Sequence, residues 1–255
     1  MLNKVPQVTV FFWIIKVLAT TVGETAADFL STTLHLGLVL TSYVMSGLFI
    51  VALLVQLTRK RYIPAIYWTV VVLISVVGTL VSDLLVDKLG VGLQKSTVLF
   101  AVILAIVFLA WWLRERDLSV HTITTTRREL FYWCAILFTF ALGTSAGDLV
   151  GESFKLGYAT AALVFAGLIA LTALAYYVLK INGVLAFWIA YILTRPLGAS
   201  MGDLLSKARD EGGVGLGTTA TSLVFLAIIV TLATYLSVTH ADDLTIQRRE
   251  ERKAA

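Results

Sequence analysis

Long apolar stretches alternate with short polar ones along the whole chain. A helix of about 20 apolar residues is long enough to cross the roughly 30 Å hydrocarbon layer of a bilayer. The pattern therefore predicts an all-α, polytopic membrane protein with eight transmembrane helices. The expected spans cover about residues 8–31, 38–57, 65–86, 95–113, 130–151, 158–179, 184–205 and 217–238.

One skeleton recurs four times: an aromatic–Trp pair, a Gly ten residues after the Trp, and an Asp fifteen residues after it. The copies start at Trp13, Trp68, Trp133 and Trp188. Their glycines are Gly23, Gly78, Gly143 and Gly198, and their acids are Asp28, Asp83, Asp148 and Asp203. Each copy has room for two spans, so all four repeats enter the membrane in the same direction. The first span carries the skeleton and is interpreted as a retained helix and not as a cleaved leader.

The two pairs of repeats are themselves related, since Trp13 to Trp133 and Trp68 to Trp188 are both 120 residues apart. Two rounds of duplication explain this spacing. We divide the chain into a first half at 1–113, a cytoplasmic linker at 114–129, a second half at 130–238 and a cytoplasmic tail at 239–255.

Composition and charge agree with lipid as the solvent. Hydrophobic residues make up 58% of the chain and charged residues 14%, where soluble proteins average about 25% charged. The loops on the side of the termini hold thirteen Lys and Arg residues, and the opposite loops hold five. We expect a multi-pass protein of the cell's inner membrane, and the positive-inside rule then predicts that both of its termini lie in the cytoplasm. The basic clusters are interpreted as topology signals and lipid contacts, with no nucleic-acid partner.

Stepping back four residues at a time from each Asp gives the polar face of each repeat helix. In the first repeat this face holds Lys16, Thr20, Glu24 and Asp28. The later repeats supply Thr79 with Asp83, Thr144 with Asp148, and Arg195 with Asp203. The face is asymmetric among repeats, as a solute path through a duplicated scaffold would require.

Acids near the bilayer centre are costly, at least about 2.5–3.5 kcal/mol each, and usually face a cavity where they do work. We predict an ion-binding site formed by Glu24, Asp28, Asp83, Asp148, Asp203, Thr20, Thr79 and Thr144. Its metal ligands would be the five carboxylates. The alternative is that each Asp caps the next turn or lies in headgroup water. Lys16 and Arg195 either balance the acids or gate them, and Arg195 has the alternative of a structural ion pair with Glu24.

Other signals concern packing. A small residue follows each repeat Gly four positions later, so we expect the four helices that carry the skeleton to pack together inside the other four. The repeat Trp residues are interpreted as anchors at the membrane interface. Pro196 predicts a kink in the seventh span.

The four copies of Trp-x9-Gly-x4-Asp resemble a family of bacterial integral membrane proteins built from four copies of a repeat of unknown function. The first copy carries the resemblance most clearly, in Phe12–Lys16 and in Thr20–Thr25, and the likeness covers about residues 4–238. It implies no substrate and no site residues.

The leading functional hypothesis is a transporter of a hard cation such as Mn²⁺ or Mg²⁺, coupled to protons where the acids titrate. A bound divalent cation would be the substrate, and no cofactor is identified. Two alternatives stay open: a membrane scaffold or sensor with structural acids, and a passive cation channel. No enzyme is expected, because His35, His121 and His240 fall in different loops and Cys134 is the single cysteine. A homo-oligomer is left open.

Overall fold

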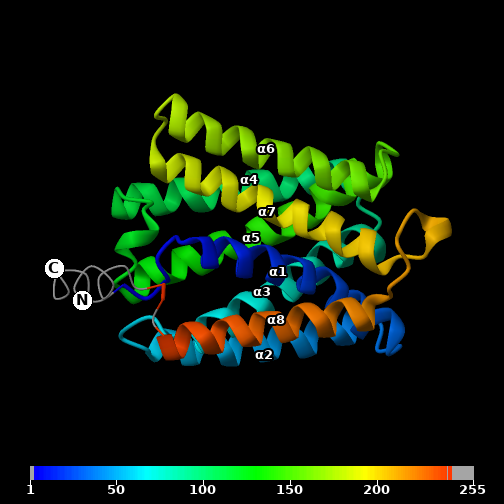
Figure 1. Cartoon of the computed structure of the whole chain (residues 1–255), viewed down its shortest axis with the longest axis horizontal. Helices are drawn as coiled ribbons and strands as arrows, with labels where there is room; N and C mark the ends of the chain where they lie inside the picture. Colours follow the sequence, from blue (N-terminus) through cyan, green and yellow to red (C-terminus); the bar gives the residue numbers. More distant parts are fainter. Residues whose placement is uncertain (1–2, 240, 243–255) are drawn as a thin grey trace.

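The computed structural model describes residues 3–239 and 241–242, and within them every regular element is a helix. The long helices are α1 (Val10–Asp28), α2 (Leu38–Thr58), α3 (Pro64–Asp83), α4 (Leu93–Glu115), α5 (Thr126–Asp148), α6 (Tyr158–Val178), α7 (Gly183–Ser206) and α8 (Thr218–Thr239). Figure 1 shows them running side by side. Of the predicted tail, residues 240 and 243–255 lie outside the described residues.

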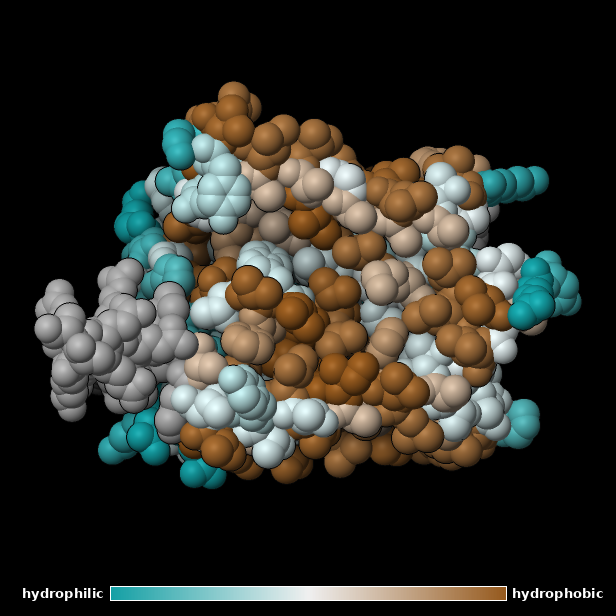
Figure 2. Space-filling model, in the orientation of Figure 1, coloured by the Kyte–Doolittle hydropathy of each residue, from teal (hydrophilic) through white to brown (hydrophobic). Residues whose placement is uncertain are grey.

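All eight long helices in the described ranges are long and apolar enough to cross a membrane. Figure 2 shows apolar residues over the middle of one face and hydrophilic residues at its two ends. The predicted class, an all-α polytopic protein with eight spans, is confirmed. The spans start and end a few residues from their predicted limits. The largest difference is at the predicted 114–129 linker: α4 extends to Glu115 and α5 begins at Thr126, so only residues 116–125 connect them.

Local signals explain where the helices begin. Thr9 and Thr125 cap α1 and α5 by accepting hydrogen bonds from the Phe12 and Arg128 amides. Asn182 does the same for α7, and α3 begins with a proline, which lacks the amide hydrogen that would be unpaired there. Helices α2, α4, α6 and α8 each begin directly after a glycine of an outer turn. Before α2 this glycine is Gly37, whose φ of +73° is a backbone conformation that favours glycine.

Four helices form a closed inner ring. Helix α1 packs against α3, α3 against α5, α5 against α7, and α7 against α1. In the most apolar stretch of these helices 50% to 61% of residues are buried, compared with 11% to 22% for α2, α4, α6 and α8. The prediction that the helices carrying the skeleton lie inside is therefore confirmed.

Each outer helix packs mainly on the inner helix of the following repeat. Helix α2 lies on α3, α4 on α5, α6 on α7, and α8 returns to α1 and closes the circle. In Figure 1, α6 lies at one edge and α2 and α8 at the other, with the inner helices between them. The repeats thus interlock, and α4 of the first half packs on α5 of the second.

The repeat glycines bring the ring helices close together. A methyl group added at Gly23 would meet Ser75, one at Gly78 would meet Phe140, and one at Gly143 would meet Arg195. The contact at Gly198 closes the circle on Thr20 of α1. Each glycine faces the residue three positions before the glycine of the next repeat, so the four interfaces are equivalent by sequence position. Backbones approach closely because glycine has no side chain.

The interpretation of the repeat Trp residues as interface anchors is wrong for three of the four. Trp68, Trp133 and Trp188 are at most 5% exposed. They pack in the ring at one end of the bundle, where the Trp188 indole donates to the Leu118 carbonyl at 2.9 Å. Their large apolar rings fill the space between helices, and only Trp13 is partly exposed.

We call the end of the bundle with residues 59–63, 116–125 and 179–182 the basic end, and the opposite end, where the repeat Asp residues lie, the acidic end. At the basic end Lys4 is buried and paired with Glu129 at 2.6 Å. Gln56 donates to the other oxygen of Glu129 at 2.9 Å. This network ties the N-terminal segment to α2 and α5, so Lys4 has a structural role besides its charge.

Candidate functional site

The ring helices turn one stripe of side chains each toward a common axis, and the stripes form four layers one helical turn apart. From the basic to the acidic end, the layers are Lys16, Val71, Ile136 and Tyr191; Thr20, Ser75, Phe140 and Arg195; Glu24, Thr79, Thr144 and Ala199; and Asp28, Asp83, Asp148 and Asp203. Every residue in the first three layers is at most 5% exposed. In the fourth layer Asp203 is buried and the other three are partly exposed.

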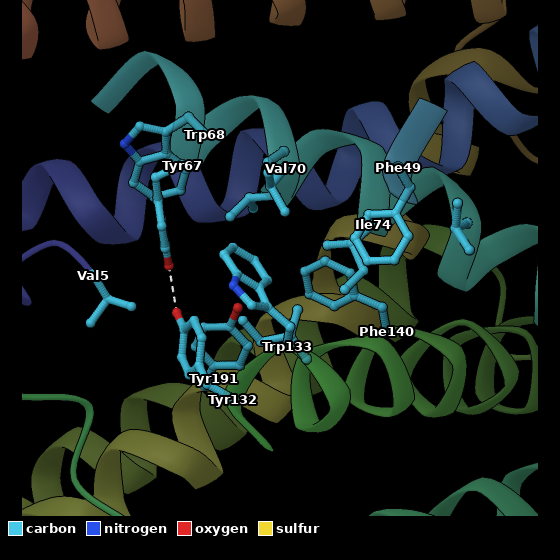
Figure 3. Packing of buried hydrophobic residues seen from close by; sticks show 14 of the residues in the cluster. Val5, Phe49, Tyr67, Trp68, Val70, Ile74, Tyr132, Trp133, Phe140 and Tyr191 are labelled. Carbon is cyan, nitrogen blue, oxygen red and sulfur yellow. Dashed lines mark hydrogen bonds between the residues drawn. The ribbon is translucent and has the colours of Figure 1, made fainter. Parts of the chain in front are cut away.

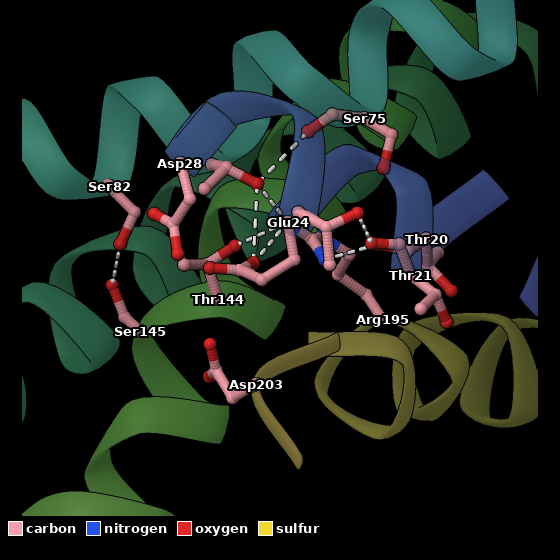
Figure 4. A network of polar contacts seen from close by, with 12 residues as sticks. Thr20, Thr21, Glu24, Asp28, Ser75, Ser82, Thr144, Ser145, Arg195 and Asp203 are labelled. Atoms are coloured by element: carbon pink, nitrogen blue, oxygen red, sulfur yellow. Dashed lines mark hydrogen bonds and ion pairs between the residues drawn. The ribbon is translucent and has the colours of Figure 1, made fainter. Parts of the chain in front are cut away.

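The guanidinium of Arg195 is fully buried and contacts all three other ring helices. Its Nη1 donates to the Thr20 carbonyl at 2.9 Å, and its Nη2 donates to Glu24 Oε2 at 3.0 Å. The same Nη2 donates to the hydroxyls of Thr79 and of Thr144, the latter at 2.8 Å. Figure 4 shows this network, with Glu24 and Arg195 at its centre. Helices α7 and α3 are opposite each other in the ring. Because Arg195 of α7 reaches Thr79 of α3, its guanidinium lies on the axis of the ring.

Glu24 is not fully occupied by this network. Its Oε2 accepts from Arg195 and, at 3.4 Å, from Thr79. Its Oε1 makes no hydrogen bond within the described residues. The Glu24 side chain is 7% exposed, whereas that of Arg195 is fully buried. Asp28 and Lys207 lie within electrostatic range of Glu24. One carboxylate oxygen is thus available next to the acidic end.

The acidic layer is bridged by a lysine that the sequence did not point to. Lys207 Nζ lies 3.2 Å from Asp28 Oδ2 and 3.9 Å from Asp203 Oδ1, joining the first and fourth repeats. Burial would lower the pKa of the Lys207 ammonium, but these two carboxylates outweigh it and raise the pKa above its usual value. Lys207 is therefore a permanent positive charge at the acidic end.

The helices differ where they pass the acidic layer. After Asp28, Asp83 and Asp148 the chain continues as a π-helical turn, over Phe29–Thr33, Leu84–Lys88 and Leu149–Ser153. Such turns are rare and often occur at functional sites. Helix α7 stays α-helical to Ser206, and its C-cap Lys207 has extended backbone. Because α7 ends without a π-helical turn, Lys207 can fold back onto Asp28. Only the tertiary structure could reveal this contact.

Lys16 lies toward the basic end, and no acidic side chain among the described residues pairs with it. It is 1% exposed, and its Nζ has no hydrogen-bond partner in the described part of the chain. The ammonium lies 4.2 Å from the centre of the Phe140 ring and 4.1 Å from that of Tyr191. Figure 3 shows the Tyr191 ring beside Tyr132, whose hydroxyl is hydrogen-bonded to that of Tyr67 at 2.5 Å, and shows Phe140 on the other side of Trp133. Cation–π attraction to these rings, about 2 kcal/mol or more when desolvated, favours the charged form of Lys16.

The predicted residues are thus collected on one axis but not around one metal position. Thr20, Thr79, Thr144, Glu24 and Arg195 share the central network, and Asp28 and Asp203 share Lys207. Asp83 lies within electrostatic range of Glu24 and Asp28. Among the described residues no three His, Cys, Asp or Glu side chains are placed to hold a metal ion together. The metal ligand set of five carboxylates stays a prediction, and it requires another conformation.

Helix α7 is continuous through Pro196, so the proline does not end the helix, and the kink stays a prediction. Pro196 does remove one backbone hydrogen bond directly after Arg195, where Gly143 allows α5 to approach. Two hydroxyls that sequence reasoning missed, Ser82 and Ser145, join α3 to α5 through a 2.7 Å hydrogen bond. Both are small polar residues between the repeat Gly and the repeat Asp, and this position was the available signal.

The comparisons with known proteins concern the repeat alone. The family model described as Repeat of Unknown Function (DUF347) matches residues 11–62, 66–117, 131–182 and 186–242. No curated protein and no solved structure matches the chain. The four matches cover most of the sequence and coincide with the four helix pairs seen in the fold. This multi-pass membrane protein therefore belongs to the family built from the DUF347 repeat of unknown function.

Proposed function

We propose that this protein is an inner-membrane transporter of a hard cation, Mn²⁺ or Mg²⁺, whose path follows the axis of the ring. The observation that carries the proposal is the Arg195–Glu24 network, in which one charged pair on the axis joins all four repeats. The acidic end would face the outside of the cell, as the distribution of Lys and Arg indicates.

Packing alone gives no reason for charges at this depth. At the Arg195 position the other repeats have Thr20, Ser75 and Phe140, all buried in equivalent contacts. A buried ion pair costs several kcal/mol of desolvation per ion, which its attraction offsets only in good geometry. Glu24 and Arg195 are confined to the first and fourth repeats. Binding and transport of an ion therefore explain these charges better than the architecture of the ring does.

The charges along the axis favour a divalent cargo. Five carboxylates, Glu24 and the four repeat Asp residues, lie on the repeat helices together with Lys16 and Arg195, and Lys207 lies at the acidic end. With all of them ionised the axis has two negative charges in excess, which one divalent cation or two protons would neutralise. Carboxylate and hydroxyl oxygens are the ligands that Mg²⁺ and Mn²⁺ prefer.

In this conformation the axis is closed, because Arg195 and Lys16 occupy it. The proposed cycle has Glu24 exchange Arg195 for the cation arriving past the acidic layer, with Oε1 as the first ligand. Protonation of Glu24 would release the cation and complete the coupling to protons. A passive channel fits less well, since two basic side chains, Arg195 and Lys16, would stand in a cation pore.

The test is flux into proteoliposomes that contain a metal-sensitive dye, with Mn²⁺ or Mg²⁺ outside and an imposed pH gradient. The wild-type protein should accumulate one of the ions, and Glu24→Gln should abolish accumulation while the protein remains folded. Glu211→Gln, an exposed acid at the same end, is the matched control and should transport normally. No wild-type flux, or equal flux in Glu24→Gln, would reject the proposal in favour of a scaffold locked by the ion pair.

A further inference from the structure

A groove opens on the lipid-facing side of α4 and α5 at the basic end. It has a volume of about 460 Å³ and is lined by Arg114, Arg127, Leu130, Phe131 and Cys134. Leu130, Phe131 and Cys134 follow Arg127 at helical spacing, so one face of α5 supplies an apolar floor below a charged rim. The floor is supported from inside, because Phe131 stacks on the fully buried Trp111 with the ring planes 6° apart.

The rim carries positive charge that is only partly neutralised by the described residues. Arg114 is exposed and makes no hydrogen bond or ion pair within the described residues. Arg127 donates through Nε to Glu115 at 2.5 Å, which orients its guanidinium while the terminal nitrogens make no bond in the described chain. Glu115 also holds Arg128 at 2.8 Å, so the nearby acid is already shared between two arginines.

The backbone adds to the same field. Helix α5 begins at Thr126, beside Arg127, and its first turn carries the positive end of the helix dipole, with Thr125 capping the Arg128 amide. An anion held between Arg114 and Arg127 would face this helix end. Charge-assisted hydrogen bonds from arginine to phosphate oxygens are the strongest pairing available to such a rim.

We propose that this groove binds one anionic phospholipid, with its phosphate between Arg114 and Arg127 and an acyl chain along Leu130, Phe131 and Cys134. From Arg127 at the rim to Cys134 the groove follows seven residue steps of α5, roughly 10 Å, and runs along the bundle as an acyl chain does. Basic pockets between transmembrane helices are suited to anionic headgroups. A free phosphate would gain the rim contacts but leave the apolar floor empty.

The chain contains its own reporter for this site, since Cys134 is the single cysteine and lines the groove. We would measure the rate of Cys134 alkylation by N-ethylmaleimide on the full-length protein in nanodiscs of phosphatidylcholine alone or with phosphatidylglycerol. Phosphatidylglycerol should slow the alkylation at least about fivefold. Inorganic phosphate added to phosphatidylcholine nanodiscs should not slow it.

The matched variants are Arg114→Ala/Arg127→Ala and Arg59→Ala/Arg61→Ala, which remove the same charge from the same end of the bundle. The first pair should lose the protection by phosphatidylglycerol, and the second should keep it. Thermal unfolding would verify that both variants fold. Equal alkylation rates in the two lipid mixtures, or protection that survives in Arg114→Ala/Arg127→Ala, would overturn the proposal. Protection by inorganic phosphate would overturn the choice of a lipid.

Discussion

Arg195 of α7 and Glu24 of α1 meet at 3.0 Å between Nη2 and Oε2, joining the fourth repeat to the first across the closing interface of the ring. Each residue is the charged exception at its position, where the other repeats have hydroxyl or apolar side chains. The pair is therefore a specialisation of the fourfold scaffold. Its energetics can be measured separately from transport.

Arg195→Met should destabilise the protein by about 3–5 kcal/mol, because it leaves the Glu24 carboxylate buried without its partner. Glu24→Gln should cost less, since the amide oxygen still accepts from Arg195, but the guanidinium loses its counter-charge. In the double variant the loss should be smaller than the sum of the two. Unfolding in mixed detergent micelles would measure all three, and strict additivity would show that the two side chains do not interact.

The acidic layer should contribute less to transport than Glu24. We expect Asp83→Asn to weaken proton-coupled cation flux without abolishing it, because Asp28 and Glu24 remain within electrostatic range of the site. The measurement is initial flux in the proteoliposome assay as a function of cation concentration. Complete loss of flux with normal folding would give Asp83 the central role instead.

Lys16→Met should leave stability unchanged or raise it by about 1–4 kcal/mol, since a fully buried ammonium without a carboxylate partner is replaced by an apolar chain of similar size. The same variant should increase passive cation flux, because a positive charge is removed from the axis. Lys180→Met, at an exposed position of the basic end, is the control and should change neither property. A large drop in melting temperature would mean that the cation–π contacts outweigh desolvation.

Gly198→Ala should destabilise the ring by about 1–3 kcal/mol through overpacking. The added methyl carbon would lie 2.6 Å from Thr20 Cβ and 3.0 Å from the Thr20 backbone carbonyl carbon, so α1 and α7 must separate. Gly47→Ala on the outer helix α2 has no atom within 4 Å and should be neutral or slightly stabilising. Thermal unfolding of both variants checks this, and equal effects would contradict the close approach at Gly198.

The linker between α4 and α5 should loosen in acid. Burial would raise the pKa of Asp117, but bonds from the Thr122 hydroxyl, the Ser119 amide and Arg128 outweigh it and hold the pKa below its usual value. Its stabilisation is thus present above about pH 4, the ordinary aspartate value, and is lost as pH falls through the lower folded value. Hydrogen exchange of residues 116–125, corrected for intrinsic rates, should rise in that range. Asp117→Asn should exchange faster at neutral pH and respond little to acid.

Orientation is best tested at positions that tolerate a side chain. Gly37 has a positive φ and Gly213 has no room for a Cβ, so cysteines there would disturb the turns. Leu89→Cys at the acidic end, 71% exposed, should be labelled by an impermeant maleimide from outside intact cells, in a Cys134→Ser background. Thr58→Cys at the basic end should be labelled only after lysis. The opposite result would reverse the predicted topology.

The amino-acid pattern by itself determined the number of spans, the fourfold repeat and the inner position of the helices carrying Gly and Asp. These follow from local physics: span length is set by the bilayer, and small residues at fixed spacing allow close helix contact. The axial location of Glu24, Asp28 and Arg195 was also foreseeable, because four-residue steps place side chains on one helix face. The Trp residues were misjudged, because lipid interface and ring interior both favour a large amphipathic ring.

Only the tertiary structure decided which side chains meet. Helix α2 packs on α3 and not on its own partner α1, a choice made by the closure of the ring and not by the sequence of one repeat. Arg195 reaches Glu24, Thr79 and Thr144 because it crosses the axis, and Lys207 reaches Asp28 because α7 ends before a π-turn forms. Such contacts depend on the register between helices and on the path of one loop. Helical periodicity specifies the face of a side chain but not its partner on another helix.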